Sequence, residues 1–265
     1  MSGPAGDDLF WRHLGCVPAF RALLRAVESR FYQRVDLPEP VLDLGCGDGQ
    51  FAQVTFDRLL AAGVDPGRRP LRAAQQAGAH RWLVQAWGGR LPFANGHFGS
   101  VISNSVLEHI PAVQPVLAEA WRVLRPAGRL MITVPSDRFT QELGGGLLLD
   151  ALGMKGLAAR YRHSFNRIAR HAHTDTAGRW ARRLTEAGFH IEHWQAYFSP
   201  AALRALEVGH LFGVPSAVLH ALTGHWVLAP WRSSLGPVER WLRPLYEEAP
   251  DGRGTMVVFI ARKPA

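Results

Sequence analysis

The sequence has little cysteine and almost no lysine. Its two cysteines, Cys16 and Cys46, are too few for a disulfide framework or a zinc site built on cysteine. Lys155 and Lys263 are the only lysines, so the net charge of +8 comes almost entirely from arginine, spread along the chain without one dense run. Such scattered charge is a weak indication of nucleic-acid binding, and we do not expect nucleic acid as the partner.

Long apolar segments are also missing. The first residues lack the apolar stretch of a signal peptide, so we expect a cytoplasmic protein. Residues 208–231 contain no Asp, Glu, Lys or Arg, but their histidines, glycines and prolines argue against a membrane-spanning helix. A buried or lid-forming helix pair is the preferred interpretation, and peripheral contact with a membrane through 208–231 stays open, as does the oligomeric state.

The segment up to residue 135 alternates between short apolar runs and helix-length stretches. The runs lie at 41–44, 63–65, 82–84, 101–103 and 130–134, and the clearest helix pattern covers 112–124. Continuous apolar strands separated by helices are typical of a parallel sheet covered on both faces. The sequence therefore predicts a doubly wound α/β domain.

The expected organisation is a single domain over residues 1–265. It consists of a leading helix at 17–37, a first half of the sheet at 38–135, and the rest of the sheet at 173–198 and 254–262. Two helical insertions are expected, at 136–172 and at 199–253. The first contains a turn signal at residues 144–146. The first insertion is interpreted as a lid.

A ligand-binding site is indicated most clearly at residues 41–50, where the first apolar run is followed by glycines at alternate positions. Glycines let the backbone turn sharply and approach a ligand at a helix N-terminus. A dinucleotide fingerprint would need a third glycine where Gln50 stands, and Asp43 and Asp48 would repel a pyrophosphate. A nucleoside with a cationic sulfonium and an ammonium group fits better, with Asp65 placed to accept ribose hydroxyls. A glycine turn that serves only packing is the alternative.

Three further motifs stand at 91–93 (LPF), 104–110 (NSVLEHI) and 122–128 (RVLRPAG). Together with the glycine segment they resemble the class I S-adenosylmethionine-dependent methyltransferases, in particular the ubiquinone/menaquinone-biosynthesis-like (methyltransferase type 11) group. The resemblance implies S-adenosyl-L-methionine as cofactor, 38–135 as the cofactor-binding half, and a Rossmann-like seven-stranded mixed sheet of order 3-2-1-4-5-7-6 with the last strand antiparallel. The cofactor-binding residues that it implies are Asp43, Gly45, Gly47, Asp65 and Asn104. Cys46, within the glycine segment, and Trp87 are further candidates for the cofactor site.

The sequence departs from this family at the adenine. An aspartate that usually follows the third strand is replaced by Ala86 and Trp87, and the usual aspartate before the fourth strand is Gly99. Trp87 either stacks on the adenine or covers the edge of the pocket. A fold that no longer catalyses the reaction is a further alternative.

Methyl transfer from a sulfonium needs positioning and water exclusion more than catalytic groups. An oxygen or carbon acceptor would still profit from a general base, and His109 is the candidate; a histidine that only packs at a helix start is the alternative. Glu108 is expected to support the cofactor loop. No metal site is expected, since His171 and His173, with His163 upstream, lack a paired carboxylate or cysteine.

The sequence thus predicts a methyltransferase whose acceptor is a small, apolar molecule, with O- or C-methylation favoured. The alternatives are an RNA or protein methyltransferase, or a noncatalytic module docking on a membrane or a partner. The base-methylation type of motif is absent, because Asn104 is followed by Ser105 and Val106. The expected acceptor walls come from both insertions: Leu147 to Leu149, Leu211, Phe212, Val218, Leu219, Trp226 and Trp231.

Overall fold

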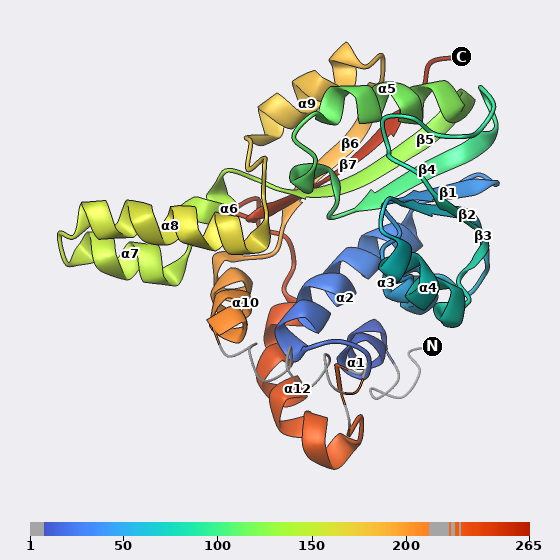
Figure 1. Ribbon diagram of the computed structural model, residues 1–265. Coiled ribbons are helices and arrows are strands. Elements are labelled where there is room, and N and C mark those ends of the chain that lie inside the picture. The colour runs from blue at the N-terminus through green and yellow to red at the C-terminus, as the bar shows by residue number, and fades with distance from the viewer. Residues whose placement is uncertain (1–7, 212–222, 224–225, 228) are drawn as a thin grey trace.

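The centre of the protein is one seven-stranded sheet (Figure 1). In this computed structural model, residues 8–211, 223, 226–227 and 229–265 are described. The strands follow the order β3-β2-β1-β4-β5-β7-β6, and β7 runs antiparallel to both β5 and β6, so the predicted fold class is confirmed. The strands are β1 (Val41–Leu44), β2 (Leu60–Asp65), β3 (His80–Gln85), β4 (Phe98–Asn104), β5 (Leu124–Pro135), β6 (His190–Tyr197) and β7 (Met256–Arg262).

The central strands are apolar along their whole length because helices cover both of their faces. Every residue of β1 and β4 is buried, whereas the two edge strands β3 and β6 expose Trp82 and Trp194. The helices are α1 (Leu9–Leu14), α2 (Ala19–Arg34), α3 (Gln50–Thr55), α4 (Arg68–Ala77), α5 (Val113–Val123), α6 (Arg138–Gln141), α7 (Gly144–Ala151), α8 (Lys155–Ala169), α9 (Ala177–Glu186), α10 (Pro200–Leu211) and α12 (Arg232–Glu247), with a 3₁₀ turn at Leu107–His109.

Two apolar cores lie on the two faces of the sheet. On one face, α5 and α9 bury side chains such as Val116 and Trp180 against the strands. On the other, α1 and α2 pack with α10 and α12 around residues such as Leu23 and Leu203 (Figure 1). The predicted leading helix is α2, and the short helix α1 before it was not predicted.

The first insertion is helical, as expected, but residues 144–146 are not a turn. They begin α7, which packs against α8, and a Cβ atom on Gly145 would lie 2.6 Å from the ring of Tyr161. The carboxylate of Glu207, on α10, accepts hydrogen bonds from the amides of Gly144 (2.6 Å) and Gly145 (3.0 Å). The glycines therefore serve close helix packing and a capped helix start.

The second insertion contributes α10 and α12. Most of the charge-free segment 208–231 lies outside the described residues, so the alternatives left open for it stay open. Among the described helices, none combines the length and the apolar character that crossing a membrane requires.

Candidate functional site

The loop between β1 and α3 is shaped by two glycines with different constraints. Gly45 has a φ of +82°, and a Cβ atom there would lie 2.4 Å from Val106. Gly47 has a φ of +54°, but nothing lies within 4 Å of where its Cβ would be. Gly45 is therefore needed for packing, whereas the space at Gly47 is open for a ligand to approach the backbone.

Two aspartates at the ends of neighbouring strands hold this loop. Asp65, at the end of β2, accepts hydrogen bonds from the amides of Gly47 (3.2 Å) and Gly67 (2.7 Å). Asp43 on β1 is buried and accepts a hydrogen bond from Nε2 of His80 at 2.9 Å. Both carboxylates line the same hollow, because parallel strands end at one edge of the sheet.

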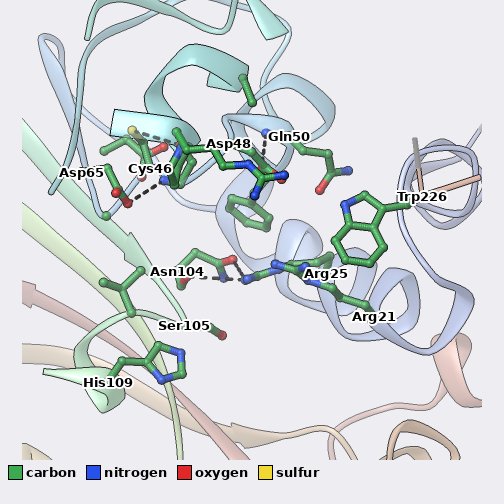
Figure 2. Close-up of a pocket in the computed structure, with 18 residues that line it drawn as sticks. Arg21, Arg25, Cys46, Asp48, Gln50, Asp65, Asn104, Ser105, His109 and Trp226 are labelled. Atoms are coloured by element: carbon green, nitrogen blue, oxygen red, sulfur yellow. Dashed lines mark hydrogen bonds between the residues drawn. The ribbon is translucent and has the colours of Figure 1, made fainter. Parts of the chain in front are cut away.

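This hollow is a cavity of about 480 Å³ at the carboxyl ends of β1, β2 and β4 (Figure 2). Its lining includes these predicted residues: Asp43, Gly45, Cys46, Gly47, Asp65, Asn104 and His109. Burial, with the charges of Asp43 and Asp65, raises the pKa of the Cys46 thiol, which is therefore neutral. The strand ends thus bring distant parts of the sequence into one site.

Trp87 does not line this cavity. Its side chain is 75% exposed and lies outside the lining, so the stack on the adenine stays a prediction. Gly99 has a structural explanation, since a Cβ atom there would lie 2.6 Å from the carbonyl oxygens of Pro38 and Glu39. The missing aspartate at position 99 is thus a consequence of close backbone packing.

The sequence gave no expectation for two arginines of α2 that line the cavity opposite the glycine loop (Figure 2). Arg25 pairs with the buried Glu28 at 3.0 Å and donates a hydrogen bond to the Asn104 side chain. Arg21, one turn earlier, forms no ion pair with any described residue. Arg21 and Arg25 are four residues apart, which places them on one face of the helix, and this spacing was the signal that could have identified them.

The ion pair of Arg25 belongs to a buried polar network. Glu28 also accepts hydrogen bonds from the hydroxyls of Ser105 (2.7 Å) and Tyr197 (3.1 Å). Burial lowers the pKa of Arg25, but the charge of Glu28 and its hydrogen bond outweigh this effect, and the net shift is upward. Arg25 is therefore a fixed cation, and Glu28 neutralises it from behind.

A second cavity, of about 210 Å³, adjoins the first. The two share Arg21, Arg25, Ser105 and His109 in their linings. The apolar part of its wall is Leu24, Phe139, Phe165, Ala169, Leu206 and Met256.

The predicted acceptor walls were only partly right. Leu147 and Leu148 line neither cavity and are exposed, by 37% and 62%, and Trp231 is 65% exposed. Trp226 lines the first cavity, not the second. Both insertions do contribute to the second cavity, but through Phe165 of α8 and Leu206 of α10; positions 212, 218 and 219 lie outside the described residues.

His109 lies where the two cavities meet. Its Nδ1 donates a hydrogen bond to the carbonyl oxygen of Arg170 at 3.0 Å, which leaves Nε2 of the neutral ring with a free lone pair. Burial lowers its pKa, as do the charges of Arg25, Arg170 and Arg21, although the Arg170 carbonyl acts in the opposite direction. The ring is therefore neutral at physiological pH, as a general base must be.

Glu108 and His171 lie beside His109. Burial raises the pKa of Glu108 to about 8, and burial lowers that of His171 to about 4. One ligand atom from each of Glu108, His109 and His171 lies within 4.8 Å of the others, a spacing that could hold a cation. Two arginines line the same cavity and oppose a cation electrostatically, and we assign no metal here.

The neighbouring histidine of the predicted pair takes no part in this cluster. His173 donates a hydrogen bond to the carbonyl oxygen of Ile110 at 3.0 Å and contacts Arg183 at 3.2 Å. His171 and His173 therefore have separate surroundings, and the role expected for them as structural histidines fits His173.

The known proteins that this chain resembles are methyltransferases. Residues 42–132 match the family model described as a methyltransferase domain. The malonyl-[acyl-carrier protein] O-methyltransferase of Legionella pneumophila is 29% identical over 144 residues, 51% of each chain. The trans-aconitate 2-methyltransferase of Azoarcus sp. (strain BH72) is 30% identical over 131 residues, 44% of this chain and 50% of that one. The chain thus spans about half the length of the curated relatives it matches.

A solved structure extends the likeness to the whole fold. The possible histamine N-methyltransferase of Thermotoga maritima superposes with a TM-score of 0.54, covering 96% of this chain and 92% of that one at 18% identity. At this identity the superposition establishes the fold alone.

Proposed function

We propose that the chain is a class I S-adenosylmethionine-dependent methyltransferase and that it methylates an oxygen or carbon atom of a small, mainly apolar acceptor. The observation that carries this proposal is the pair of adjoining cavities, one bordered by the glycine loop and the other by apolar side chains. His109 lines both cavities.

The first cavity fits S-adenosylmethionine in shape and charge. The open space at Gly47 lets a ligand lie against the backbone, and Asp65 keeps oxygen lone pairs for the ribose hydroxyls. Arg21 is a cation without an ion-pair partner among described residues and suits the methionine carboxylate, with Asn104 nearby. When bound, S-adenosylmethionine supplies a methyl group on a positively charged sulfur that leaves readily.

The second cavity supports the acceptor assignment. Its apolar wall, formed by Leu24, Phe139, Phe165, Ala169, Leu206 and Met256, favours an apolar body. Its polar lining residues are Arg21, Arg25, Ser105, Glu108, His109, His171 and His210, which favour a polar group on the same acceptor. Both curated relatives are named for substrates that carry carboxylates, and an oxygen nucleophile is therefore the first acceptor type to test.

We assign to His109 the removal of a proton from the acceptor. Its Nδ1 is held by the Arg170 carbonyl, so Nε2 can accept a proton without a change of tautomer. Helices α8 and α10 exclude water from this corner by packing Phe165 and Leu206 across it. A His109→Gln variant should lower kcat by about 10²-fold or more with a phenol or hydroxyl acceptor while cofactor affinity stays within about twofold.

The first experiment is calorimetric titration with S-adenosylmethionine and S-adenosylhomocysteine. Gly47→Arg should abolish binding, because the new side chain fills the open space of the cavity. Gly78→Arg is the matched control: Gly78 also has a positive φ (+68°) and open space around its Cβ position, but it lies at the end of α4, outside the cavity lining. Absence of binding to a folded wild-type protein would overturn the proposal.

The acceptor search then separates the remaining classes. Transfer of a labelled methyl group is measured with lipophilic phenols, quinone precursors, carboxylic acids and total RNA in parallel. Transfer to RNA or protein would favour the macromolecular alternative, and cofactor binding without transfer to any acceptor would favour a noncatalytic module. The small-molecule proposal expects transfer to a phenol or an acid. His109→Gln should reduce transfer to a phenol, whose proton must be removed, but not to a carboxylic acid, which is already ionised at neutral pH.

A further inference from the structure

Helices α7 and α8 form a hairpin that extends away from the rest of the molecule (Figure 1). Its outer end, residues 148–157, is here called the hairpin tip. A Cβ atom on Gly153 or Gly156 would meet nothing within 4 Å, and every tip residue except Leu149 is exposed. The tip is thus surrounded by solvent in the isolated chain.

The tip is nevertheless apolar. Leu148 and Leu152 are 62% and 64% exposed, and Met154 and Leu157 are 42% and 44% exposed. These four side chains gather at the end of one projecting element. Single exposed leucines are ordinary on protein surfaces, but such a cluster indicates a contact with another apolar phase.

The hairpin is also strongly basic. Its one acidic residue, Asp150, is neutralised by Arg162 at 2.7 Å. Lys155, Arg160 and Arg167 on α8 are exposed and form no ion pair with any residue that the structure describes. An apolar end that carries the cation of Lys155 and is followed along α8 by Arg160 and Arg167 matches a lipid surface, where hydrocarbon lies beneath anionic headgroups.

We propose that the hairpin tip inserts into the interfacial region of a membrane that contains anionic lipids. Leu148, Leu152, Met154 and Leu157 enter the boundary between headgroups and acyl chains. Lys155 and Arg160 lie at the level of the headgroup phosphates, which supply the anions that the protein lacks there. The inference does not depend on methyl transfer, and it concerns a different segment from residues 208–231.

The base of the hairpin is fixed, so insertion of the tip would orient the whole molecule. Glu207 binds the amides at the start of α7 and the hydroxyl of Tyr161 on α8. Phe165, about 12 Å along α8 from Leu157 at 1.5 Å per residue, lines the second cavity. A tip in the lipid thus places the second cavity near the membrane surface, within reach of an amphipathic acceptor.

Vesicle sedimentation with the full chain tests membrane insertion of the tip directly. The vesicles contain phosphatidylcholine alone or phosphatidylcholine with roughly 30–40% phosphatidylglycerol. We expect binding to the anionic vesicles that weakens at high salt. Leu152→Asp with Met154→Asp should reduce the partition coefficient at least about tenfold, and so should Lys155→Glu with Arg160→Glu. The matched controls are Leu59→Asp, where the leucine is 55% exposed away from the hairpin, and Arg182→Glu on α9; both should bind like wild type.

Two results would overturn the proposal. One is wild-type protein that fails to sediment with anionic vesicles at low salt. The other is binding that the tip variants leave unchanged, which would move the contact elsewhere on the chain. If the tip variants instead convert a dimer into a monomer on size exclusion, without vesicle binding by the wild type, the tip is an interface between copies and the membrane proposal is wrong.

Discussion

The glycine loop and helix α2 border the same cavity from opposite sides, but they are held by different means. The loop is positioned by the end of β1, by the positive φ angles of its own glycines and by the carboxylate of Asp65 on the neighbouring strand β2. Helix α2 is positioned by distant contacts, through Glu28 to Ser105 and Tyr197. The loop is therefore a sequence motif, whereas the arginines of α2 gain their meaning only from the fold.

The largest expected effect on stability comes from removing the charge of Arg25 on α2. Arg25→Met leaves Glu28 buried without its cation and should lower the free energy of unfolding by about 3–5 kcal/mol. Arg21→Met, one turn away on the same helix, should change it by less than about 0.5 kcal/mol, because Arg21 has no ion-pair partner among described residues. Urea denaturation measures both. Equal losses for the two variants would contradict the network described for Glu28.

The next effect distinguishes the two glycines of the loop, Gly45 and Gly47. Gly45→Ala adds a Cβ close to Val106 at a positive φ and should cost about 2–4 kcal/mol of stability. Gly47→Ala meets no atom, so only the backbone strain of about 1–2 kcal/mol applies. Thermal unfolding measures the stability of the two variants. Calorimetry should show that Gly47→Ala weakens cofactor binding, although it is the more stable of the two. The reverse stability order would refute the distinction between packing and ligand space.

A smaller effect depends on pH. Glu108 has a folded-state pKa of about 8, well above its ordinary value near 4.5, because it is buried. Between these two values the folded chain holds a proton that the unfolded chain has released, so this group makes the protein less stable as pH rises from 4.5 to 8. Glu108→Gln should remove that slope, which is at most about 1.4 kcal/mol per pH unit.

The comparison of unfolding free energies at pH 5, 6.5 and 8 checks this expectation. His13 contributes in the opposite direction: burial lowers its pKa to about 3, so its contribution to stability is lost as the pH falls below 6.5. This contribution is the same in both proteins and cancels in the comparison. Parallel pH profiles for wild type and Glu108→Gln would show that Glu108 titrates normally.

The smallest effect concerns two tryptophans. Trp87→Ala should leave cofactor affinity within about twofold, because its side chain is 75% exposed and lies outside the cavity lining. Trp226→Ala should weaken it by about tenfold, since Trp226 lines the cavity beside Arg21 (Figure 2). A strong loss for Trp87→Ala would restore the adenine stack expected from its place after the third strand.

Several features could be predicted because they depend on neighbours in sequence. The five apolar runs became β1 to β5, and six of the seven expected cofactor residues line one cavity. Residues 144–146 were misread as a turn, and the reason for Gly99 was not visible, because the contacts are distant in sequence: Gly99 packs on Pro38 and Glu39, and Gly145 on Tyr161. A glycine needed for close packing looks the same in sequence as a glycine needed for a turn.

The sequence by itself determined the sheet pattern, the glycine loop and its acidic strand ends, because period, positive φ and strand termini are local properties. The tertiary structure alone decided which cations face the loop, which walls enclose the second cavity and which leucines remain exposed. Arg21 and Arg25, Phe165 and Leu206, and the hairpin tip come from segments far apart in the chain. Their chemistry arises from proximity in space, which no local pattern encodes.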